Sequence, residues 1–156
     1  MMENTDKQLC SLVAEIELVY HTTVKPSQMP KVTCSKDAYD ILIASWDQGK
    51  INLIEQCKIL LLNRANKVLG ICEISSGGMS GTIVDVKLIF AAALKAGASG
   101  FIIAHNHPSG NLTASQADRA FTRRLKLAGE LLDLPLLDHI ILGSEGFISF
   151  EDEGLL

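Results

Sequence analysis

The chain has 156 residues and a net charge of −4 at pH 7, with 47% hydrophobic and 21% charged residues. This length fits one domain of ordinary size, and this composition is typical of a globular fold, which excludes a disordered chain. The acidic balance argues against a broad basic surface for nucleic acid, and an aromatic content of only 5% argues against a stacking platform for single strands.

The distribution of apolar residues and cysteines predicts a reduced, cytoplasmic protein with no membrane partner. No apolar run approaches the roughly 18–20 residues that a membrane span needs, and the first ten residues lack the pattern of a signal peptide. Cys10, Cys34, Cys57 and Cys72 include no CxxC pair. Cys57 and Cys72 lie inside apolar runs, which is typical of reduced core thiols.

We predict that residues 1–32 form an N-terminal extension with a strand and a linker. Residues 14–20 alternate apolar side chains with two glutamates, which favours a half-buried strand, although neighbouring apolar residues also fit a helix. Pro26 and Pro30 mark a linker. We place the main domain at residues 33–156.

The sequence of the main domain predicts alternating helices and strands. In chain order we expect a helix from Ser35 to Gly49 with Trp46 on its apolar face, a hairpin of strands 57–62 and 68–74, a flexible loop at 75–81, a helix from Asp85 to Gly97, a buried strand at 101–104, a long helix from Ser115 with Phe121, Leu125, Ala128 and Leu132 on its buried stripe, and a final hairpin of strands 136–142 and 147–150. This order predicts a three-layer α/β (α+β) domain with a mixed sheet flanked by helices.

Two histidines at the end of the buried strand predict a metal site. Side chains two residues apart on an extended strand share a face, so His105 and His107 project together. The loop 108–114 lets the chain turn back, and Asp118 in the first turn of the next helix can supply a third ligand. Two imidazoles and one carboxylate suit Zn²⁺ and leave a fourth position for a water, whose pKa the metal lowers to about 7.

The start of the long helix has a second interpretation. Ser115-Gln116-Ala117-Asp118 is also a capping box, in which both side chains serve backbone amides. The two uses can coexist at one helix start. An iron site of two histidines and one carboxylate is the other metal alternative.

The segment from His105 to Asp118 matches a known pattern. It resembles the HxHPx₆SxxD core of the JAMM (MPN+) metalloproteases, and the stretch HNHPSGNLTASQAD, followed by LLDLPLLDHIILG, resembles their RadC branch. The resemblance covers about residues 33–150. It implies a JAMM (JAB-type) fold with one zinc held by His105, His107 and Asp118, and it weighs against iron. It also implies that Ser115 helps to stabilise an oxyanion, with the plain N-cap as the alternative.

The implied mechanism needs a general base, for which the sequence offers two glutamates. The resemblance favours Glu55, just before the first strand of the hairpin. Glu73 on the second strand is the competitor, although it can simply be the polar alternate of a half-exposed strand. Asp138 and His139 also match the RadC pattern; they can orient a metal ligand or form a satisfied core pair, and we favour the core pair slightly.

Together these features predict a zinc-dependent hydrolase of amide or isopeptide bonds, in which Glu55 acts as the base. The alternative is an accessory or binding module of DNA repair or mobile elements with a structural or vestigial metal. The complete ligand set favours the hydrolase, because an accessory module needs no open metal site. The substrate, whether peptide, protein or another amide, is not specified. A nucleic-acid partner rests on family association alone, and the sequence predicts no oligomeric state.

Overall fold

One mixed sheet organises the computed structural model, which describes residues 20–78 and 83–156. Its strands are β1 (Gln56–Leu62), β2 (Val68–Ser76), β3 (Gly100–Asn106), β4 (Leu136–Gly143) and β5 (Gly146–Ser149), in the order β2-β1-β3-β4-β5. The β3–β4 pair is parallel and the other three pairs are antiparallel. Parallel neighbours need a crossover connection, and a long helix between β3 and β4 supplies it.

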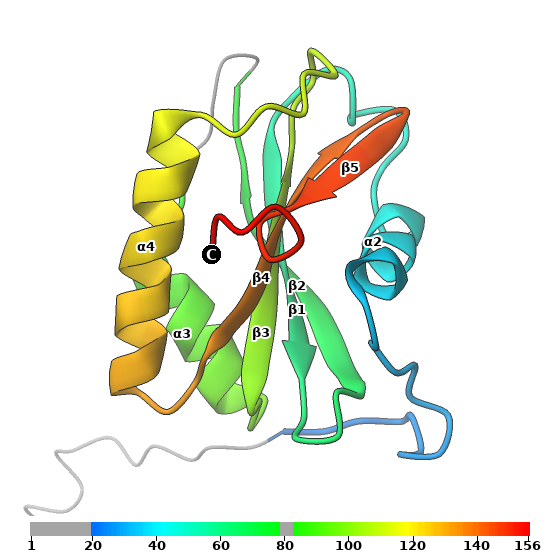
Figure 1. Cartoon of the computed structure of the whole chain (residues 1–156). Helices are drawn as coiled ribbons and strands as arrows, with labels where there is room; N and C mark the ends of the chain where they lie inside the picture. The colour runs from blue at the N-terminus through cyan, green and yellow to red at the C-terminus, as the bar shows by residue number, and fades with distance from the viewer. Residues whose placement is uncertain (1–19, 79–82) are drawn as a thin grey trace, which may run out of the picture.

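The helices cover both faces of the sheet (Figure 1). Helix α2 (Ser35–Ala44) lies on one face, and α3 (Val86–Lys95) and α4 (Gln116–Leu131) lie on the other. The central strands β1 and β3 are buried along their whole length, as expected for strands that are covered on both faces. The structure therefore confirms the predicted class, an α/β domain with a mixed sheet between helices.

Local sequence signals account for most helix ends. The Asp85 side chain caps α3 by accepting the Lys87 N–H, and Gly97 follows the helix with a φ of 62°. Helix α2 differs from the prediction, because it ends at Ala44 rather than near Gly49. The Ser45 hydroxyl and amide both turn back to the Leu42 carbonyl, which closes the last turn early.

Other boundaries also differ from the sequence prediction. Ser75 and Ser76 pair with β1, so they belong to β2 and not to the predicted flexible loop. Residues 79–81 of that loop, and residues 14–19 of the predicted N-terminal strand, lie outside the described residues. Leu132, which we predicted on the buried stripe of the long helix, follows the end of α4 and is 44% exposed. Thr122, which was not predicted there, is buried on that helix.

Two apolar clusters fill the space between the sheet and the helices. Trp46 and Ile102 belong to the cluster beneath α2, and Phe90, Ile103 and Leu125 belong to the cluster beneath α3 and α4. The second cluster borders the candidate site described below. Within residues 20–78 and 83–156, no helix has the length and apolarity that a membrane crossing demands.

Candidate metal centre

The end of β3 carries the two histidines of the predicted site. His105 is only 5% exposed and His107 is half-buried just beyond the strand. Their side chains reach the same pocket because residues two apart on a strand share a face. Asn106 alternates to the opposite face of the sheet, where it is fully buried.

Asn106 fastens the segment before β1 to this strand. Its side-chain oxygen accepts the Gln56 N–H at 2.8 Å, and its amide donates to the carbonyls of Ile51 and Ile54 at 2.7 and 2.9 Å. A buried amide that satisfies three backbone groups fixes the path of the chain between them. Glu55 lies inside that segment, so Asn106 positions its backbone relative to the histidines.

The third candidate ligand, Asp118, lies in the first turn of α4 and has two functions. Its Oδ2 accepts the Ser115 N–H at 2.7 Å, and Ser115 Oγ accepts the Asp118 N–H at 3.1 Å. The predicted capping box is therefore present. The other carboxylate oxygen, Oδ1, lies 3.3 Å from His105 Nε2. The Asp118 side chain thus caps the helix with one oxygen and lies beside the histidines with the other.

The hydrogen-bond partner of His107 fixes which ring nitrogen carries its proton. His107 Nδ1 contacts the backbone carbonyl of Asn111. A carbonyl oxygen only accepts hydrogen bonds, so Nδ1 must be the donor. In the neutral imidazole this leaves a lone pair on Nε2, the nitrogen that faces His105 and Asp118.

A longer chain of hydrogen bonds fixes His105 in the same tautomer. The Thr122 hydroxyl donates to the Asp118 carbonyl at 2.7 Å, so its oxygen accepts from His139 Nδ1, also at 2.7 Å. His139 Nε2 is then an acceptor for His105 Nδ1 at 2.8 Å. Burial first, and His105 second, hold the pKa of His139 well below its usual range, so its ring is neutral. In the neutral ring, His105 Nε2 is then left with a lone pair.

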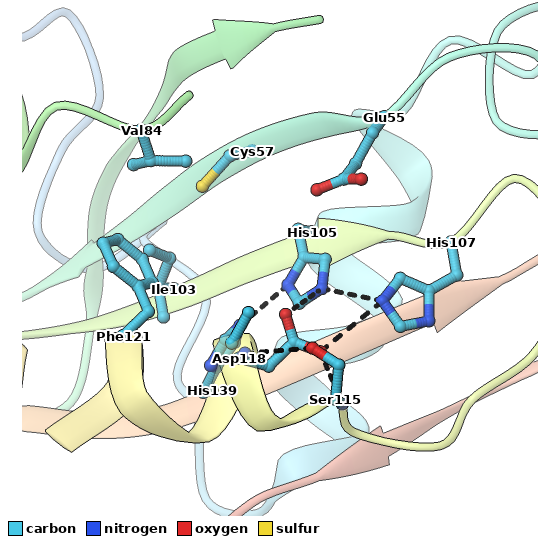
Figure 2. A pocket seen from close by; sticks show the side chains of 11 residues that line it. Glu55, Cys57, Val84, Ile103, His105, His107, Ser115, Asp118, Phe121 and His139 are labelled. Carbon is cyan, nitrogen blue, oxygen red and sulfur yellow. Dashed lines mark hydrogen bonds and ion pairs between the residues drawn. The ribbon is translucent and has the colours of Figure 1, made fainter. Parts of the chain in front are cut away.

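Three candidate ligand atoms therefore converge (Figure 2), and no proton lies between them when both rings are neutral in these tautomers. The two Nε2 atoms lie 3.0 Å apart, and His105 Nε2 lies 3.3 Å from Asp118 Oδ1. Two ligands of a tetrahedral ion with bonds of about 2.0–2.1 Å lie about 3.3 Å apart, close to these separations. Such lone pairs repel one another unless a cation lies between them. His105, His107 and Asp118 can thus hold a metal ion.

The charge of Asp118 suits the same purpose. Partial burial raises the pKa of this carboxyl, but contacts with His105 and with Ser115 outweigh the effect and hold it well below its usual range. The group is therefore a carboxylate at neutral pH. Two imidazole nitrogens and one carboxylate oxygen form a donor set that fits a divalent cation.

The two candidate bases lie in different surroundings. Glu55 is half-buried and lines a cavity of about 410 Å³ together with His105, His107, Ser115 and Asp118, and its carboxylate points toward the histidines (Figure 2). Glu73 is on edge strand β2 and is not among the residues lining that cavity. It accepts a hydrogen bond from Gln56 at 3.0 Å and has a half-exposed side chain.

Asp138 and His139 are not the core pair that the sequence analysis favoured. Neighbours on a strand point to opposite faces. Asp138 accepts from the Ser149 hydroxyl and from the amides of His139 and Glu151, and its pKa is raised by burial. His139 lines the cavity on the other face and bonds to His105. Only His139 contacts a candidate ligand.

Sequence reasoning passed over Asn106 and Thr122. Each left a signal that could have been used. Asn106 lies between two histidines of one strand face and must point into the core, where a buried amide requires partners. Thr122 is one helical turn after Asp118 and therefore lies on the same side of α4.

A family model and several relatives match this chain. The model of the RadC-like JAB domain matches residues 32–155. A UPF0758 protein of Flavobacterium johnsoniae is 43% identical over 148 residues, which are 93% of this chain and 62% of that protein. A UPF0758 protein of Symbiobacterium thermophilum is 32% identical over 149 residues, with 96% of this chain and 62% of that protein covered.

A third relative, a UPF0758 protein of Porphyromonas gingivalis, is 45% identical over 103 residues, which are 65% of this chain and 45% of that protein. This chain therefore spans about three fifths or less of the length of these curated relatives. The names of these relatives state no activity.

Proposed function

Because this chain belongs to the RadC-like JAB domain family, we propose that it is a zinc-dependent hydrolase of amide or isopeptide bonds. The observation that carries the proposal is the convergence of one ligand atom each from His105, His107 and Asp118, in a cavity that Glu55 and Ser115 also line. Two histidines and one carboxylate with an open fourth position are a typical zinc donor set for catalysis.

The metal would be held by His105 Nε2, His107 Nε2 and Asp118 Oδ1. When bound, zinc supplies Lewis acidity and lowers the pKa of water to about 7. Glu55 is the proton acceptor in this proposal: it takes a proton from the attacking water and gives it to the leaving amine. Its half-buried position in the cavity supports this role.

Ser115 is the proposed hydrogen-bond donor to the substrate carbonyl oxygen. Its Oγ accepts the Asp118 N–H, and no group in the described part of the chain takes its hydroxyl proton. That proton is free to stabilise negative charge as it develops on the carbonyl oxygen. The capping box holds Ser115 in place beside Asp118, so one helix start would supply both a ligand and a donor.

The test compares two glutamate variants. A pooled peptide and isopeptide library is incubated with zinc-loaded protein, and mass spectrometry reports the cleavages that a chelator abolishes. Glu55→Gln should keep wild-type zinc affinity and lose cleavage, whereas Glu73→Gln should keep both, because Glu73 does not line the cavity. Undiminished cleavage by Glu55→Gln would overturn the proposed base. Zinc binding without any cleavage would favour an accessory module.

A further inference from the structure

Two hollows meet at the groups that would react. The cavity of about 410 Å³ and a second hollow of about 310 Å³ share Glu55, His107 and Ser115 as lining residues. A chain-like substrate that crosses these three residues would therefore extend into a hollow on each side. The chemical character of each hollow indicates what it can accept.

The larger cavity is apolar away from the metal ligands. Val84, Ile103 and Phe121 lie together at the end opposite His107 and Ser115 (Figure 2), and Cys57 lies beside them. We call these four residues the apolar recess. Strand register explains its position, because Ile103 is two residues before His105 on one face of β3, and Cys57 pairs with His105 across β1.

The recess carries no charge. Cys57 and Ile103 are 1% and 0% exposed, and burial, with a smaller contribution from Glu55, raises the pKa of the Cys57 thiol to about 12, which keeps it neutral. Val84 and Phe121 are half-buried and pack on the apolar cluster beneath α3 and α4. An anionic group placed there would lose its hydration and find no cation among these four residues.

The smaller hollow differs in kind. It is lined by the loop after β3, which presents Ser109, Asn111 and Thr113 beside Pro108. The two sides of the reacting position are therefore unequal, one apolar and one polar.

We propose that the site selects substrates with one apolar side chain, of about the size of leucine or phenylalanine, directly beside the scissile amide, and that this side chain occupies the apolar recess. The inference rests on the proposed hydrolase function. Burial of apolar surface supplies the selectivity, at about 25 cal/mol per Å² removed from water. At about 410 Å³ the cavity lies near the lower end of the range for ligand sites, about 300–1,000 Å³, which fits one side chain with its amide.

A hydroxamate series tests the recess by binding rather than by turnover. The hydroxamate group binds zinc, and its substituent extends beside the metal. Acetohydroxamate, 3-methylbutanohydroxamate, 3-phenylpropanohydroxamate and the charged succinic monohydroxamate are titrated into the zinc-loaded chain. We expect the two apolar members to bind about 10- to 100-fold more tightly than acetohydroxamate, as two to three buried methylene equivalents give. The charged member should show no gain.

Variants locate the gain. Phe121→Ser and, with less risk to folding, Val84→Ser should each reduce the apolar gain severalfold while acetohydroxamate still binds. Leu127→Ser is the matched control, because Leu127 is on the same helix, is 68% exposed and does not line the cavity. A flat series with intact acetohydroxamate binding, or a gain that survives in both recess variants, overturns the recess and leaves the hydrolase proposal standing. Binding of no hydroxamate contradicts both.

Discussion

Thr122 is the far end of the hydrogen-bond chain that fixes His105, so Thr122→Val tests whether that chain prepares the metal site. Valine has nearly the same shape but removes two hydrogen bonds of 2.7 Å, one to the Asp118 carbonyl and one from His139 Nδ1. The His139 N–H then has no partner in the core, which costs about 1–3 kcal/mol. The ring avoids this cost by moving its proton to Nε2, which faces His105.

The consequence reaches the metal site. With a proton on His139 Nε2, His105 must accept at Nδ1 and carry its own proton on Nε2, where the metal would bind. Zinc binding must reverse this change, so we expect Thr122→Val to weaken zinc affinity about 10- to 100-fold, the usual effect of losing a group that orients a ligand. Competition with a chromophoric chelator measures the affinity, and long-range ¹H–¹⁵N NMR of the metal-free protein reports the tautomers directly.

Thr122→Ser is the matched control for this effect. Serine keeps the hydroxyl and loses only a methyl group, so zinc affinity should stay within about threefold of wild type and the tautomers should not change. If the valine and serine variants bind zinc equally tightly, the hydrogen-bond chain has no part in preparing the site, and the reasoning is refuted.

Three further changes test neighbouring features. Asn106→Ala leaves three backbone groups of the segment before β1 unpaired, so it should lower the free energy of unfolding in urea by more than about 2 kcal/mol. Loading this variant with as much zinc as the wild-type chain holds should not restore turnover. Asp118→Asn should weaken zinc binding but keep the helical circular dichroism signal, because Ser115 still caps the helix. A variant whose helix melts, together with a wild-type protein that holds no zinc, would favour capping alone. His139 has a lowered pKa in the folded state, so below about pH 6.5 the unfolded state binds more protons than the folded state. The free energy of unfolding of the metal-free protein should therefore decrease as the pH is lowered, by up to about 1.4 kcal/mol per pH unit. His139→Phe should show a shallower fall in urea unfolding between about pH 7 and about pH 5, and an unchanged slope would contradict the buried neutral ring.

The parts of the site that were predictable depend on local sequence. The placement of His105 and His107 follows from the two-residue period of a strand, and the approach of Asp118 follows from a short loop that ends in a capping box. Both relations span few residues, so their geometry does not depend on how distant segments pack. The alternation of elements likewise predicted the fold class, because each element carries its own apolar period.

The contacts that prepare the site depend instead on register between distant segments. His139 reaches His105 because the parallel β3–β4 register sets it opposite Ile103, on the face that His105 shares. No spacing in the sequence specifies that register. The interpretation of His139 as half of a core pair with Asp138 failed for this reason, since adjacent strand residues alternate faces and only the register shows what each side meets.

The metal content of the chain purified without chelators tests the central claim most directly. We predict about one zinc per chain by elemental analysis, with an absorption-edge spectrum that fits nitrogen and oxygen ligands at about 2.0–2.1 Å and no sulfur. His105→Ala and His107→Ala should each lose the zinc, because two remaining ligands hold it poorly. A wild-type chain that neither contains zinc nor takes it up on titration would contradict the account. Zinc retained by the variant that combines His105→Ala with His107→Ala would contradict it as well.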